Sequence, residues 1–162
     1  MSAYSVGPDV KFICAPLSIR KGADERVTWA VYELKGGLTL LSWIQKGVDC
    51  VTDMIPLPQK EPQIQSLLSP DEIGEWVLVN YGNTRLECHN RSKENVQWTW
   101  DIPQQASSLR IFKASECPPT RTIDGHVLLA ISTKAEFYPI SPENPPSDPA
   151  VSLALEEVIS FV

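Results

Sequence analysis

The sequence predicts an all-β protein, most simply an antiparallel β-sandwich built from two related halves, with a β-trefoil or barrel as the alternative. Three observations lead to this fold class. Apolar and polar residues alternate with a period of two along much of the chain, as on strands that are buried on one face. Turns containing glycine or proline separate these runs, and helical periodicity is almost absent before the C-terminal tail. The third observation is an internal repeat of side-chain types.

This repeat relates residues 10–32 to residues 79–101, which lie 69 positions further along the chain and match without a gap. A pattern that recurs at a fixed distance is typical of a duplicated structural unit. We therefore predict two related β units. The matched pairs are Phe12 and Tyr81, Leu17 and Leu86, Ile19 and Cys88, Glu25 and Glu94, Val27 and Val96, Trp29 and Trp98, and Val31 and Trp100.

Two hairpins are predicted in most detail. The first spans residues 26–45 and has glycines at its turn, where a positive φ is needed. The second joins residues 76–81 to residues 84–89 through Gly82 and Asn83. Further strands are predicted near residues 10–14, 48–54, 109–113, 126–132 and 135–138, and a short helical turn is predicted around Ile64–Leu68.

Prolines divide the chain into segments. They concentrate between the two repeats and again before the C-terminus, where they stop strands and stiffen a connection. The predicted organisation is a first β unit at 1–54, a proline-rich crossing at 55–75, a second β unit at 76–138 that shares one core with the first, a proline-rich spacer at 139–149 and an apolar C-terminal tail at 150–162.

The tail fits two structural templates. On a helical wheel most of its apolar residues share one face, with Asp148 as a cap and Pro149 at the first helical position. Its apolar residues also alternate as on a strand, with only Glu157 out of place. We predict a short C-terminal helix, with an extended arm as the alternative. Since an exposed apolar tail would be adhesive, it is expected to dock on its own sheets or on a second copy, giving a homo-oligomer through residues 150–162.

Composition limits the expected partners and location. The net charge of −6 repels phosphate backbones, so no nucleic acid is expected as a partner. No apolar run approaches the length needed to span a membrane, and the N-terminus lacks the pattern of a signal peptide. We therefore expect a cytoplasmic protein without a membrane partner. The four cysteines are spread along the chain, which favours reduced and mostly buried thiols.

Few residues suggest catalysis. Neighbours on a strand point to opposite faces, so we expect Cys88 inside the protein and His89 in solvent. Asp124 could orient His126 as an acid–base pair, but the same residues are typical of a plain turn that leads into a strand. Apart from Cys88 and His89, no cysteines or histidines have the spacing of metal ligands, so we predict no metal site and no cofactor.

Aromatic side chains offer the remaining candidate site. Trp29 and Trp98 are expected in the core as equivalent residues of the two units. Trp43 and Trp76 are less tied to an apolar face, so we expect them to be exposed and able to contact a sugar ring or a protein. The predicted ligand-binding residues are Trp43, Trp76, Tyr81, Asn83, Asp124 and His126.

These observations predict an acidic, lectin-like module that binds a protein or a carbohydrate through loops and aromatic edges and is not catalytic. One alternative is a structural protein that assembles through its C-terminal tail. The other is a hydrolase-type enzyme that uses Asp124 and His126.

Overall fold

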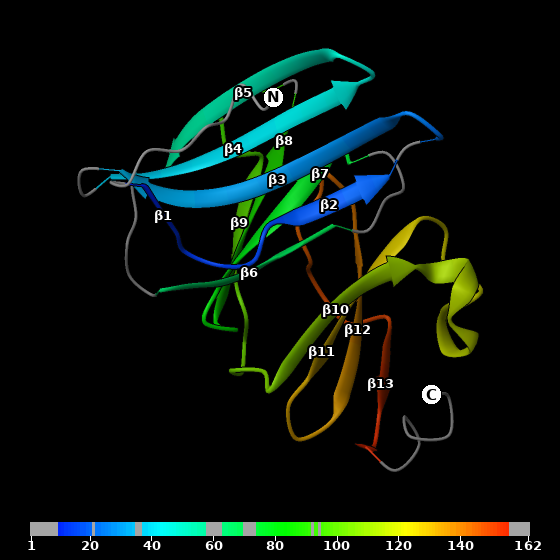
Figure 1. The fold of residues 1–162 in the computed structure, drawn as a ribbon. Helices are drawn as coiled ribbons and strands as arrows, with labels where there is room; N and C mark the ends of the chain where they lie inside the picture. The colour runs from blue at the N-terminus through cyan, green and yellow to red at the C-terminus, as the bar shows by residue number, and fades with distance from the viewer. Residues whose placement is uncertain are drawn as a thin grey trace.

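The computed structural model describes residues 10–20, 22–34, 37–57, 63–69, 74–91, 93 and 95–155. This part of the chain is nearly all-β (Figure 1). It contains no helix long and apolar enough to cross a membrane. Its elements are β1 (Val10–Phe12), β2 (Leu17–Arg20), β3 (Glu25–Leu34), β4 (Gly37–Lys46), β5 (Asp49–Leu57), β6 (Ile64–Leu68), β7 (Trp76–Tyr81), β8 (Arg85–Asn90), β9 (Trp98–Asp101), β10 (Ser108–Lys113), the 3-10 turns η1 (Ala114–Glu116) and η2 (Pro118–Thr120), β11 (His126–Ile131), β12 (Ala135–Ile140) and β13 (Val151–Leu153).

The strands form three antiparallel sheets. The N-terminal sheet has the order β1-β3-β4-β5, with β2 also paired to β3. The central sheet has the order β6-β7-β8-β9, and the C-terminal sheet has the order β10-β11-β12-β13. None of the three closes on itself, so the all-β antiparallel class is confirmed and the closed-barrel alternative is wrong. Both predicted hairpins and the five further strands are present near their predicted positions.

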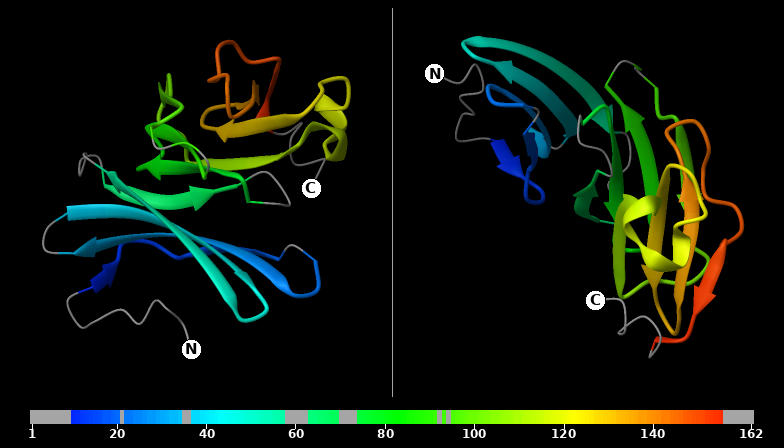
Figure 2. Two further views of the ribbon diagram at one scale, coloured as in Figure 1. Left: turned by 90° about the horizontal axis from the view of Figure 1, so that it is seen from above. Right: turned by 90° about the vertical axis from the view of Figure 1, so that its right-hand side faces the viewer.

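The sheets stack in three layers, with the central sheet between the other two (Figure 2). Trp29 and Leu40 of the N-terminal sheet pack against Val77 and Tyr81 of β7. On the other face of the central sheet, different residues of β7 and β8 pack against β11 and β12. Every residue of β7 is consequently buried. Both faces of the central sheet are therefore covered by other sheets, whereas a two-layer sandwich would leave one of them in solvent.

The C-terminal tail begins as a strand. Val151–Leu153 form β13, which pairs with β12 from Ala135 to Phe137. The helix predicted for the tail is wrong at these residues, because the edge of β12 supplies backbone partners and Val151 and Leu153 pack beside Phe137. Residues 156–162 lie outside the described part of the chain.

The helical turn predicted at Ile64–Leu68 is also wrong, since these residues form β6. Its pairing with β7 contains a β-bulge between Ile64 and Ser66. A bulge adds one residue to one strand and shifts the alternation of its side chains. Ile64 and Leu67 consequently share the buried face with a spacing of three, which imitates the period of a helix.

The internal repeat has only a partial structural counterpart. Trp29 and Trp98 are both buried, but they lie on opposite sides of the central sheet. Leu17 pairs with Trp29 across β2 and β3, whereas Leu86 pairs with Trp100 across β8 and β9, so the two registers differ by two residues. The origin of the fold from two related halves stays a prediction.

Candidate functional site

A row of polar side chains lies on one face of β8 and the residue that follows it. The row consists of Arg85, Glu87, His89 and Arg91. Of the residues that alternate with them, Leu86 and Cys88 belong to the core beneath the C-terminal sheet. Successive side chains on a strand point to opposite faces, so the polar row faces the N-terminal sheet. Glu87 and His89 are buried there. The prediction that Cys88 is inside is confirmed, and the prediction that His89 is in solvent is wrong because a third layer covers that face.

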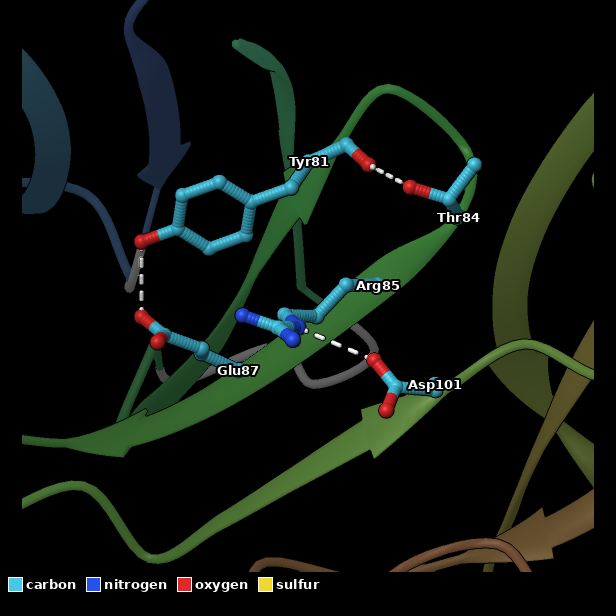
Figure 3. Close-up of polar contacts among 5 residues, drawn as sticks. All are labelled: Tyr81, Thr84, Arg85, Glu87 and Asp101. Atoms are coloured by element: carbon cyan, nitrogen blue, oxygen red, sulfur yellow. Dashed lines mark hydrogen bonds and ion pairs between the residues drawn. The ribbon is translucent and has the colours of Figure 1, made fainter. Parts of the chain in front are cut away.

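Glu87 accepts hydrogen bonds from two buried side chains. The Tyr81 hydroxyl donates to Glu87 Oε1 at 2.7 Å, and His89 Nε2 lies 3.3 Å from the same oxygen. Figure 3 shows the Tyr81 hydroxyl directed at Glu87, with the Arg85 guanidinium on the same side of β8 and bonded to Asp101 at 2.9 Å. Burial tends to raise the pKa of Glu87, but the bonds from His89 and Tyr81 and the nearby positive charge lower it overall. Burial, and then Glu87, raise the pKa of Tyr81.

The lowered pKa of Glu87 predicts an acid-dependent loss of stability. Its carboxylate stabilises the fold fully above its ordinary pKa of 4.5, and this contribution disappears as the pH falls through the lower folded value. Glu87→Gln cannot titrate, so the difference in unfolding free energy between wild type and Glu87→Gln should shrink from neutral to acid pH. Urea denaturation of both proteins across this range measures the difference. A difference that stays constant would contradict the prediction.

The far end of the polar row opens into a cleft of about 690 Å³ between β5 and the central sheet. Arg91 reaches into it with a side chain that is 10% exposed. Its Nη2 lies 3.7 Å from Asp53 Oδ2, and its Nη1 lies 3.7 Å from Glu75 Oε1. Its Nε is buried and makes no hydrogen bond within the described structure. The described residues that line the cleft are Asp53, Met54, Ile55, Pro56, Glu75, Arg91, Lys93 and Asn95.

Two of the predicted ligand-binding residues, Tyr81 and Asn83, have structural partners. Asn83 has a positive φ of 58° in the turn between β7 and β8. Its side-chain oxygen accepts from Asn80 Nδ2 at 2.7 Å, and its backbone N–H donates to the Asn80 side chain at 3.0 Å. The Thr84 hydroxyl donates to the Tyr81 carbonyl at 2.9 Å (Figure 3). Asn83 therefore shapes the turn, and Tyr81 supports Glu87.

The other predicted residues lie apart from the polar row. Trp76 is only 3% exposed, so the prediction that it is exposed is wrong. Its ring lies edge-on to the ring of His126, with 5.9 Å between the ring centroids. Asp124 is exposed in the turn before β11, and Trp43 is half-buried on β4. The structure thus brings together Trp76 with His126 and Tyr81 with the turn of Asn83, but it does not gather the six residues into one site.

Cysteine and metal chemistry contribute little to this site. The described residues contain no group of three or more His, Cys, Asp or Glu side chains that could hold a metal ion. Burial raises the pKa of the Cys88 thiol to about 12. Cys50 is exposed, while Cys14 and Cys117 are half-buried, so the prediction of mostly buried thiols is wrong.

Arg91 and Glu87 were not among the predicted site residues. The sequence does contain a pattern that could have pointed to them, the alternation of ionisable side chains from Arg85 to Arg91. Such alternation is typical of a strand face in solvent, and only the third sheet shows that this face is covered. The chain matches no protein-family model, and a comparison with curated proteins found no match. The geometry of the polar row and the cleft is therefore the basis for the function.

Proposed function

We propose that this protein is a non-catalytic binding module that holds an extended segment of a partner protein in the cleft beside β5. The stacked sheets serve as a β-sandwich scaffold that fixes both walls of this cleft. The observation that carries the proposal is the exposed apolar surface of β5 and its turn. Val48 is 100% exposed, Val51 59% and Met54 64%, and Met54 also lines the cleft. Val51 and Met54 point to opposite faces of β5, so apolar surface is exposed on both sides of this edge strand, and exposed apolar surface is typical of protein interaction sites.

The aromatic residues favour a protein over a carbohydrate as the ligand. A sugar ring needs an exposed aromatic face on which to stack. Trp29, Trp76 and Trp98 are buried, and Trp100 packs against the core beneath the C-terminal sheet. Trp43 is the remaining tryptophan, and it does not line the described part of the cleft. The lectin-like alternative consequently has little support.

The two other predicted functions are also less well supported. Assembly through residues 150–162 would need the tail to leave its own chain, but Val151–Leu153 already pair with β12. An enzyme that uses Asp124 and His126 would need an accessible imidazole, whereas the His126 ring packs on the buried Trp76.

The test places a photo-crosslinking side chain at Met54 and, in a control, at Thr133, an exposed residue in the turn between β11 and β12. The protein captured specifically from Met54 is then purified, and its affinity is measured by calorimetry for wild type, Met54→Asp and Thr133→Asp. We expect Met54→Asp to weaken binding by about tenfold or more, since an apolar contact is replaced by a charge. Thr133→Asp should leave the affinity unchanged. Equal binding by both variants would overturn the proposal, as would a sugar that binds through Trp43.

A further inference from the structure

The guanidinium of Arg91 has donors that its described neighbours do not satisfy. Both carboxylates near it lie at 3.7 Å, beyond the usual length of about 2.7–3.2 Å for an N–H···O hydrogen bond. Its Nε is buried and has no acceptor within the described structure, although nine-tenths of the side chain is buried. A buried donor without an acceptor costs free energy that a ligand with an acceptor can recover. A ligand in the cleft that accepts a hydrogen bond from Arg91 would therefore be stabilised.

The charges around the cleft indicate that this group is uncharged. Among the described residues that line the cleft, Arg91 and Lys93 carry two positive charges, and Asp53 and Glu75 carry two negative charges. An anionic ligand would approach two carboxylates, and a cationic ligand would approach two basic groups. A neutral acceptor can bond to Arg91 Nε while the four charges remain balanced. Ile55 lies on the same face of β5 as Asp53 and adds apolar surface to this side of the cleft, whereas Met54 and Pro56 border the cleft and point to the opposite face of the strand.

The backbone of β5 supplies further hydrogen-bonding groups at the same place. Residues of an antiparallel strand alternate between those that bond to the neighbouring strand and those that face away from it. Pro56 has no N–H, and a proline within an edge strand directs its nitrogen away from the ladder. The register between β4 and β5 is regular from Leu38 to Lys46, so Met54, two residues before Pro56, also faces away from β4. Its N–H and C=O are thus directed to the outer edge of β5, beside the cleft.

We propose that the occupant of the cleft is an uncharged, extended peptide segment, one backbone carbonyl of which accepts the Nε–H of Arg91 while another accepts the N–H of Met54. This inference rests on the proposed function and names the chemistry of the segment. Backbone bonds give such a complex its affinity, and the apolar side chains on the two faces of β5, Ile55 on one and Met54 on the other, select apolar side chains of the segment.

The test uses the full chain, labelled with nitrogen-15, and two capped peptides that differ at one residue. The first is acetyl-Val-Thr-Val-N-methylamide, and the second has Asp in place of Thr. We expect the uncharged peptide to shift the Nε–H signal of Arg91 and the amide signal of Met54 in a saturable manner. The Nε–H signal of Arg85 is the internal control, because Arg85 Nε already donates to Asp101.

Two variants test whether the Nε–H of Arg91 donates to the peptide. Arg91→Lys keeps the charge near Asp53 and Glu75 but removes the Nε donor, so the dissociation constant of the uncharged peptide should rise by about tenfold or more. Lys134→Gln removes a positive charge in the turn between β11 and β12, away from the cleft, and should leave the dissociation constant unchanged. Tighter binding of the peptide that contains Asp, unshifted signals of Arg91 and Met54, or equal affinity of Arg91→Lys and wild type would each overturn the inference. If the inference fails, the proposed function can still be supported, because its own test measures whether a partner protein depends on Met54.

Discussion

Glu87→Ala is expected to lower the free energy of unfolding by roughly 2–6 kcal/mol, because two buried donors lose their shared acceptor and each unsatisfied donor costs about 1–3 kcal/mol. These donors are the Tyr81 hydroxyl and His89 Nε2, and both residues are buried between the N-terminal and central sheets. Alanine offers neither group an oxygen. Denaturation by urea at neutral pH, followed by tryptophan fluorescence, measures the loss.

Asp101→Ala is the matched control for this substitution. Asp101 also accepts a hydrogen bond from a β8 neighbour, Arg85, at 2.9 Å, but its side chain is 76% exposed (Figure 3). Exposed ion pairs contribute about 0–1 kcal/mol, so this variant should remain close to wild type. Equal losses from the two substitutions would contradict the assignment of Glu87 as a shared buried acceptor.

The hairpins could be predicted from the sequence because their signals are local. Alternation marks the strands on either side of each turn, and Gly82 and Asn83 accept the positive φ that the turn between β7 and β8 requires. Both φ values lie close to 60°, as expected for this kind of turn. The strands of the first hairpin also pair in a regular register over ten residues of β3.

The third layer could not be predicted, since alternation shows that a strand has two different faces but not what covers the polar one. Glu87 and His89 belong to a face that reads as solvated, yet the N-terminal sheet buries both. The same limitation explains Trp76, which packs beneath the C-terminal sheet against His126. Contacts between residues so far apart in the chain leave no local pattern, and the candidate site depends on them.

The contacts of Arg91 in the cleft are a second example of what the sequence could not predict. Its two acidic neighbours, Asp53 and Glu75, come from segments that the sequence assigns to the first β unit and the proline-rich crossing. The pairing of β7 with β8 places Glu75 beside Arg91, whereas only the stacking of the N-terminal sheet on the central sheet brings Asp53 to it, and each carboxylate lies 3.7 Å from the guanidinium. Sequence spacing could therefore identify Tyr81 and Asn83 as neighbours across a turn, but not the group of charges around Arg91.

Gly74→Ala is expected to lower the free energy of unfolding by roughly 2–5 kcal/mol, the sum of about 1–2 for a left-handed residue and about 1–3 for overpacking. Gly74 has a φ of +69°, and a Cβ there would lie 2.9 Å from Val27 Cγ1 and 3.0 Å from Val27 Cβ. Rotation of the Val27 side chain cannot move its Cβ, so the backbone itself must shift. Gly74 also accepts a hydrogen bond from Trp29 Nε1 at 3.0 Å, which ties β3 to the segment before β7.

Gly47→Ala separates the two contributions. Gly47 has a φ of +61°, but a Cβ at this position would meet nothing within 4 Å, so only the backbone cost of about 1–2 kcal/mol should remain. Adding Val27→Ala to Gly74→Ala should give a smaller loss than the sum of the two single substitutions, because the clash with Val27 Cγ1 is removed. If Gly74→Ala and Gly47→Ala cost the same, or if the losses at Val27 and Gly74 are additive, then the N-terminal sheet does not pack as closely on the start of β7 as the contact with Val27 requires.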